Sequence, residues 1–171
     1  MTVGLRVVEV SRPGPPGYFR AANEGAGLLD WDTTARRFAA QRNYWISTAS
    51  NAARPHAMPV WGVWLDDQLL FSTSPESRKA RNLFENPRVA VHIEDGNASI
   101  VVEGRAHEVR DSVELSAFLA AYNPKYAWDF TFDQVSHGVF AVRPEKAFAW
   151  LGSDTDTFGG TGTRWRFATT P

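Results

Sequence analysis

The chain contains no cysteine among its 171 residues, and this absence excludes several kinds of chemistry. Disulfide bridges, thiolate nucleophiles and thiolate metal sites all need that residue. No apolar stretch approaches the roughly 20 residues of a membrane-spanning helix, and the N-terminus lacks the apolar core of a signal peptide. We therefore expect a soluble, cytoplasmic protein with no membrane partner.

Net charge and paired functional groups are also scarce. The formal charge of −1 gives no general attraction to nucleic acid, so we expect no such partner. No two carboxylates stand out as a general acid and base, so the sequence assigns no catalytic residue. The four histidines lack the close spacing of a metal site, and we expect no bound metal. They are His56, His92, His107 and His137.

What the chain does contain is turns and short apolar segments. Ten prolines and thirteen glycines, with 43% hydrophobic residues, are typical of a turn-rich globular domain. We expect residues 1–20 to form a flexible arm and residues 21–171 a single domain. The pattern predicts helices over 28–41, 75–85 and 112–122. It predicts strands over 44–48, 56–65, 68–74, 88–94, 99–109, 138–144, 147–151 and 163–167. This order favours an α+β, mainly β protein built on a small barrel or sandwich.

The helix expected over 75–85 has positive charge where negative charge is favoured. Arg78 and Lys79 lie in its first turn, where unpaired N–H groups already give a partial positive charge. Ser74 suits the N-cap and Pro75 the first helical position. Two cations at such an end are explained if they bind an anion, typically a phosphate. The alternative is that both side chains are simply solvated.

Several segments together resemble the pyridoxamine 5'-phosphate oxidase-like family, and in particular its flavin- or deazaflavin-dependent oxidoreductases. The most specific segment is Glu76-Ser77-Arg78-Lys79 between a strand and a helix. The supporting segments are Arg54 to Trp61, Leu69 to Ser74, Asn86-Pro87-Arg88-Val89-Ala90 and Val101 to Ala106. The similarity covers roughly residues 35–150.

This resemblance implies a split β-barrel (Greek-key, FMN-binding type) with short peripheral helices, which forms a homodimer with a coenzyme in each cleft between the subunits. Arg78 and Lys79 would hold the coenzyme phosphate, beside Ser77, Thr73 and Ser74. The strand Pro59-Val60-Trp61-Gly62 would offer backbone groups to the coenzyme ring. Trp150 and Arg164 resemble the aromatic residue and the arginine that complete the site near the C-terminus.

The departures from the family concern the substrate. True pyridoxamine phosphate oxidases carry an arginine and a lysine where this chain has Met58 and Val63, and their Arg-x-His motif is absent here. Oxidation of vitamin B6 is therefore not expected. Pro59-Val60-Trp61 is more similar to the branch that uses the deazaflavin coenzyme F-420, although FMN remains open. We expect residues 121–126 to lie at the edge of the cleft. Lys125 among them is expected to be a surface lysine, and the alternative is a contact with the coenzyme tail.

The leading interpretation is an oxidoreductase that transfers a hydride between its coenzyme and a small organic substrate. Such a coenzyme brings its own hydride chemistry, which fits a chain without an acid–base pair. One alternative is a flavin or deazaflavin carrier or sensor without turnover. A more distant one is a haem-binding protein, because some split-barrel relatives bind haem.

Overall fold

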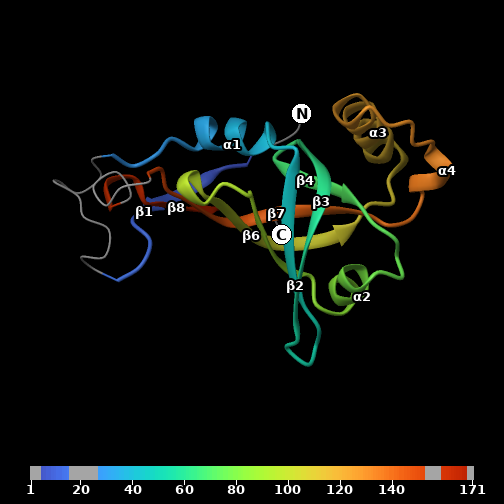
Figure 1. Cartoon of the computed structure of the whole chain (residues 1–171), viewed down its shortest axis with the longest axis horizontal. Coiled ribbons are helices and arrows are strands. Elements are labelled where there is room, and N and C mark those ends of the chain that lie inside the picture. The colour runs from blue at the N-terminus through green and yellow to red at the C-terminus, as the bar shows by residue number, and fades with distance from the viewer. Residues whose placement is uncertain (1–4, 16–26, 153–158, 169–171) are drawn as a thin grey trace.

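The computed structural model describes residues 5–15, 27–152 and 159–168, and it confirms an α+β, mainly β fold (Figure 1). The helices are α1 (Trp31–Ala39), α2 (Arg78–Glu85), α3 (Ser112–Tyr126), α4 (Phe132–Val135) and the 3-10 turn η1 (Gly96–Ala98). The strands are β1 (Val7–Ser11), β2 (Asn43–Ala49), β3 (Pro55–Leu65), β4 (Gln68–Ser72), β5 (Arg88–His92), β6 (Ile100–Glu108), β7 (Val139–Ala149) and β8 (Thr163–Phe167).

Six antiparallel strands close into a barrel. Their order is β7-β4-β3-β2-β5-β6, and β6 pairs again with β7. The other edge of β7 is divided, because residues 139–142 pair with β4 and residues 146–149 pair with β8. Strands β8 and β1 extend the sheet beyond the barrel. The split β-barrel expected from the sequence is therefore confirmed.

Two segments differ from the sequence-based expectation. Residues 7–11, expected in a flexible arm, form β1, in which Glu9 makes ion pairs with Arg164 and Arg166 of β8 at 3.2 and 3.3 Å. Residues 1–4 and 16–20 of the expected arm lie outside the described residues. The two strands predicted over 138–144 and 147–151 are the single strand β7, which includes Pro144 opposite Gly104 at an irregularity of β6.

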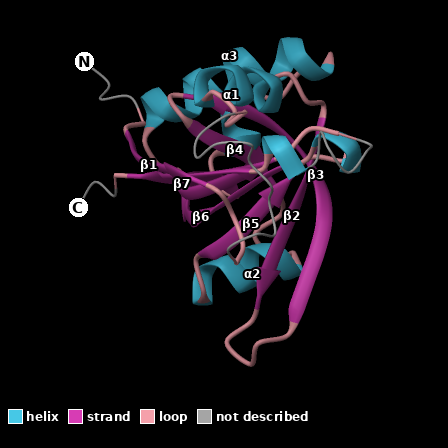
Figure 2. Ribbon diagram, turned by 90° about the vertical axis from the view of Figure 1, so that its left-hand side faces the viewer, coloured by secondary structure: helices cyan, strands magenta, loops and turns pink. Residues whose placement is uncertain are grey.

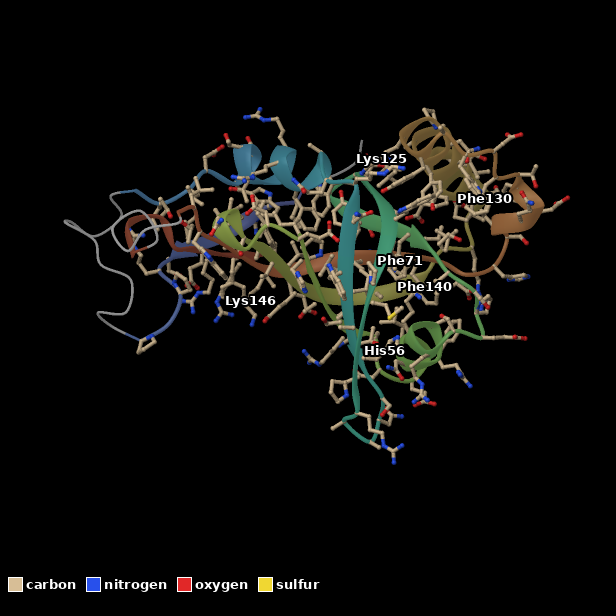
Figure 3. All side chains as sticks on the ribbon, viewed as in Figure 1. His56, Phe71, Lys125, Phe130, Phe140 and Lys146 are labelled. Carbon is tan, nitrogen blue, oxygen red and sulfur yellow. The ribbon has the colours of Figure 1, made fainter. Side chains whose placement is uncertain are left out.

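The core has two parts. The larger fills the barrel, where Phe71 and Phe140 stack with ring centroids 5.8 Å apart (Figure 3). Helix α1 adds Trp31 and Phe38 to it, and α2 adds Leu83. Figure 2 shows α1 and α3 on one side of the barrel and α2 on the other. The smaller part lies between α3 and the outer faces of β3, β4 and β7, and it includes Val63, Leu70, Phe118 and Ala141. No helix in the described part of the chain is long and apolar enough to cross a bilayer.

The last turn of α3 joins three elements through Lys125. Its Nζ donates to the Gly62 carbonyl of β3 at 2.9 Å and to the Ala39 carbonyl at the end of α1 at 3.3 Å. It also lies 3.4 Å from the Tyr44 hydroxyl of β2. The side chain is half-buried, so it is not the solvated surface lysine expected from the sequence. Burial, with a smaller effect of the Arg42 charge, lowers the Lys125 pKa to about 8.

Gly138 fixes the approach to α2 and gives a test of the fold. Its φ is +86°, its carbonyl accepts from Thr73 N–H at 2.9 Å, and a Cβ there would clash with the Thr73 carbonyl and crowd Pro75. We expect Gly138→Ala to lower the free energy of unfolding by about 2 kcal/mol or more, measured by urea denaturation. Gly96→Ala is the control: its Cβ would meet nothing within 4 Å, so a change within about 0.5 kcal/mol is expected. Equal effects of the two changes would contradict this account.

The buried position of Lys125 makes stability depend on pH. Between the folded pKa of about 8 and the ordinary value of 10.5, the unfolded chain binds a proton that the folded chain does not. Stability rises with pH wherever the unfolded state binds more protons. Relative to Lys125→Met, the wild type should therefore gain stability as the pH rises through this interval. Solvent screening at a half-buried site limits the gain to about 1 kcal/mol. Urea denaturation of both proteins across this pH interval measures the difference in their free energies of unfolding. If that difference stayed constant or fell as the pH rose, the lysine would not be desolvated.

Candidate functional site

Helix α2 begins three residues later than the sequence suggested. Ser77, not Ser74, is the N-cap: its hydroxyl accepts from Ala80 N–H at 3.2 Å. The Ser74 hydroxyl instead accepts from Glu76 N–H at 3.2 Å, in a turn closed by Ser77 N–H to the Ser74 carbonyl at 2.9 Å. This turn occupies residues 74–77, so the helix begins only after it. Arg78 and Lys79 are consequently the first two residues of the helix.

The cations at this helix start have no acidic partner among the described residues. No ion pair or side-chain hydrogen bond involves Arg78 or Lys79 there, and the N–H groups of both residues have no acceptor in the same part of the chain. Arg78 is exposed, whereas Lys79 is half-buried and burial lowers its pKa. Thr73 donates its hydroxyl hydrogen to the Ser77 hydroxyl oxygen at 3.1 Å. The five predicted phosphate residues (Thr73, Ser74, Ser77, Arg78 and Lys79) therefore gather at one place, as a cradle suited to a phosphate.

Strands β3 and β4 of the barrel separate from each other near this cradle. The ladder between β3 and β4 ends at the pair Gly62–Phe71, and among the strands of the described residues, residues 55–61 of β3 pair with β2 alone. β4 instead follows β7 and leads through Thr73 into α2. The ring strand predicted from the sequence, Pro59 to Gly62, therefore begins on an open strand edge. Pro59 has no N–H and offers only its carbonyl there.

An open recess of about 430 Å³ adjoins the same strand. Its size lies within the range of small-molecule sites. Trp61 is 37% exposed and stacks on Tyr126, with ring centroids 4.8 Å apart and an angle of 6° between the rings. The recess therefore offers a flat aromatic surface. Its lining residues are Asn43, Pro59, Val60, Trp61, Glu94 and Tyr122.

Trp150 and Arg164 lie at the other end of the barrel from the phosphate cradle. Arg164 is opposite Phe148 on β7, whereas Thr73 is bonded to Gly138 just before β7 begins. Ten residues, from 138 to 148, separate these positions along β7, a path of about 30 Å. Arg164 is also engaged locally, with Ser11 at 3.1 Å and Glu9 at 3.2 Å. One subunit thus does not bring these two predicted site residues to the others.

Residues that hold the ring strand were only partly anticipated. Lys125 and Tyr126 both bond to the backbone of Gly62, and the Arg42 guanidinium lies over the rings of Trp61 and Tyr126 at 5.4 and 5.3 Å. The sequence placed residues 121–126 near the cleft but gave no signal for Arg42. In the residues that the structure describes, no three His, Asp or Glu side chains gather as a metal site would need. The arrangement is suited to bind an anionic group and a flat ring.

Solved structures with the same fold support this architecture. A conserved hypothetical protein from Mycobacterium tuberculosis is 19% identical, with a TM-score of 0.66 over 77% of this chain and 90% of its own. A FAD-binding protein from Mesorhizobium loti is 21% identical, with a TM-score of 0.57 over 80% and 95%. An F420 reductase is 24% identical, with a TM-score of 0.50 over 61% and 87%.

Haem proteins share the fold as well. A haem-binding protein from Mycobacterium smegmatis and a haem storage protein from Vibrio cholerae are 19% and 20% identical, with TM-scores of 0.56 and 0.57. The first match covers 72% of this chain and 57% of the other protein, and the second covers 72% and 98%. At these identities the likeness establishes the fold and not the ligand.

The family itself is shown by the sequence. No curated protein sequence matches the chain. The sequence profile described as pyridoxamine 5'-phosphate oxidase matches residues 31–151, which include the phosphate cradle, the ring strand and the whole closed barrel. The chain therefore belongs to the pyridoxamine 5'-phosphate oxidase family.

Proposed function

We propose that this protein is a homodimeric oxidoreductase that transfers a hydride between a bound coenzyme, either F-420 or FMN, and a small organic substrate. The observation that carries the proposal is the pair Arg78 and Lys79 at the start of α2, which have no acidic partner among residues 5–15, 27–152 and 159–168. Both coenzymes have a phosphate and a flat tricyclic ring. The F420 reductase and the FAD-binding protein among the structural neighbours support a ligand of this class.

The residues of this chain would bind and orient the coenzyme. Arg78, Lys79 and the free N–H groups of the helix start would hold the phosphate, with hydroxyls from Thr73 and Ser77 beside them. The open edge at Pro59 and the exposed face of Trp61 would hold the ring. When bound, the coenzyme supplies the hydride chemistry, so the chain needs no acid–base pair of its own.

The arrangement also explains why we propose a dimer. Trp150 and Arg164 lie about 30 Å along β7 from the phosphate cradle of their own subunit. They can complete a coenzyme site only if that site lies between two subunits. A two-fold dimer would then contain two equivalent sites, each with a cradle from one copy and these two residues from the other.

Coenzyme binding tests the phosphate cradle. Each charged hydrogen bond is worth about 1.5–3 kcal/mol, so Arg78→Ala/Lys79→Ala should weaken the binding of F-420 and FMN far more than tenfold. Tryptophan fluorescence in a titration with each coenzyme measures this. Arg81→Ala is the matched control, since it removes an exposed cation from the same helix and should leave the affinity unchanged. Undiminished affinity in the double variant would refute the assignment.

The wild-type titration also separates the candidate functions. Preference for F-420 would favour a deazaflavin-dependent reductase, and preference for FMN a flavin enzyme or carrier. Coenzyme binding without turnover of any electron-poor substrate would favour the carrier or sensor. Binding of neither coenzyme, with a Soret band after addition of haem, would favour the haem-binding alternative that two structural neighbours raise.

Complementation between subunits tests the composite site. Two variants are needed, and each should bind coenzyme poorly as a pure dimer: the double variant Arg78→Ala/Lys79→Ala and the single variant Arg164→Ala. In a mixed dimer one site carries both changes and the other carries neither. Co-expression with random pairing should therefore restore roughly one quarter of the sites, counted by coenzyme titration. No restoration, in mixed dimers verified by differential tags, would show that the site does not combine these residues from two subunits.

A further inference from the structure

The Tyr126 hydroxyl replaces a backbone pairing that is missing between β2 and β3. The β2–β3 register puts Asn43 opposite Trp61, so the next pair would be Arg42 and Gly62, but β2 begins at Asn43. The Tyr126 hydroxyl oxygen lies between them. It accepts from Gly62 N–H at 2.8 Å and lies 2.6 Å from the Arg42 carbonyl and 2.8 Å from the Gly62 carbonyl. The backbone groups that lack a strand partner are thus satisfied by a side chain of α3.

Lys125 holds the other polar group of the same glycine. Its Nζ donates to the Gly62 carbonyl at 2.9 Å, and no carboxylate pairs with it within the described ranges. On the far side, a Cβ at Gly62 would lie 2.9 Å from the Leu70 carbonyl of β4 and 3.1 Å from the Leu69 side chain. Gly62 is therefore fixed from β4 on one side and from the last turn of α3 on the other.

The same turn also fixes the side chain next to Gly62. Trp61 stacks on the Tyr126 ring, and the Arg42 guanidinium covers both rings at 5.4 and 5.3 Å. Aromatic and cation–π contacts of this kind favour one orientation of the indole. Figure 3 shows Lys125 at the top of β3 and His56 at its lower part beside α2, so the support of the ring strand and the phosphate cradle approach β3 from opposite ends.

The last turn of α3 is itself held in place. Pro124 fixes its backbone, and Ala127 ends the helix at φ 51° with its N–H bonded to the Asn123 carbonyl. The Asn123 side chain bonds the backbone of Phe130 in both directions, at 2.9 and 3.1 Å. The support for Gly62 therefore comes from a helix end whose backbone is itself hydrogen-bonded to the segment that follows it.

We infer that Lys125 and Tyr126 are positioning residues, which hold Gly62 and Trp61 so that the strand before them presents its open edge to the coenzyme ring. The inference rests on the proposed function, because it concerns the ring half of the same site. It assigns affinity for the ring to the end of α3 and affinity for the phosphate to the start of α2. Neither residue touches the reacting atoms in this account.

The experiment compares Lys125→Met and Tyr126→Phe with the wild type, using two ligands. One ligand is whichever of FMN and F-420 the wild type binds, and the other is inorganic phosphate, followed by calorimetry. We expect each variant to bind the coenzyme about tenfold more weakly or worse, with phosphate affinity within about twofold of the wild type. Arg36→Met, which removes an exposed cation from α1, is the control and should change neither affinity.

A measurement without ligand keeps the two proposals separable. Amide hydrogen exchange at Gly62 should be about tenfold faster or more in Tyr126→Phe, because its N–H loses its acceptor. Unchanged exchange at Gly62, unchanged coenzyme affinity, or equal losses for coenzyme and phosphate would each overturn the positioning role while leaving the coenzyme site intact. A wild type that binds neither coenzyme would overturn the proposed function and this inference with it.

Discussion

The separation of β3 from β4 after the Gly62–Phe71 pair is the constraint on which the rest of the site depends. A closed ladder at this point would leave no free strand edge and no space for a helix start. Because β4 pairs with β7 instead, its chain turns at Pro75 into α2, which begins with Arg78 and Lys79 and packs against β2 and β3. An open edge normally invites association with another chain, so proteins cover or use it. Here residues 59–61 of β3 line a recess, and α2, whose first two cations have no acidic partner in the described part of the chain, packs against the same strand; both features suit a ligand site.

The strands around the site and the start of α2 could largely be predicted from the sequence, because residues close together in the chain determine them. Short apolar segments between turn residues predicted β2, β3 and β4 within a few residues, and Asp66-Asp67 forms the expected hairpin turn, with φ of 46° and 61°. The position of Arg78 in the first turn of α2 was also predicted. The N-cap was not, because Ser74 and Ser77 both suit a cap and only the turn around Pro75 selects the second.

What the sequence could not give depends on distance in space. The resemblance grouped Trp150 and Arg164 with the phosphate residues, but the length of β7 separates them within one subunit. β1 was missed because the prolines and glycines of residues 13–17 favoured an arm, although Val7, Val8 and Val10 favour a strand once β8 offers an edge. Lys125 looked like any surface lysine, since its acceptors come from α1 and β3, far away in the chain. Contacts with residues that are distant in the chain cannot be recognised from a local sequence pattern.

The two ends of the ring strand are built on different principles, and this difference bears on how the family could change its chemistry. At the start of α2, charge and free N–H groups would recognise a phosphate whatever ring is attached to it. At the end of α3, Gly62 and Trp61 are held by a tyrosine hydroxyl, a lysine and a stacked ring, all of which act on the shape of one strand. Under the proposed function, substitutions on α3 would alter which ring fits and leave the phosphate contacts of α2 in place. In the proposed function, such a division would let one barrel hold different flat rings beside the same phosphate group.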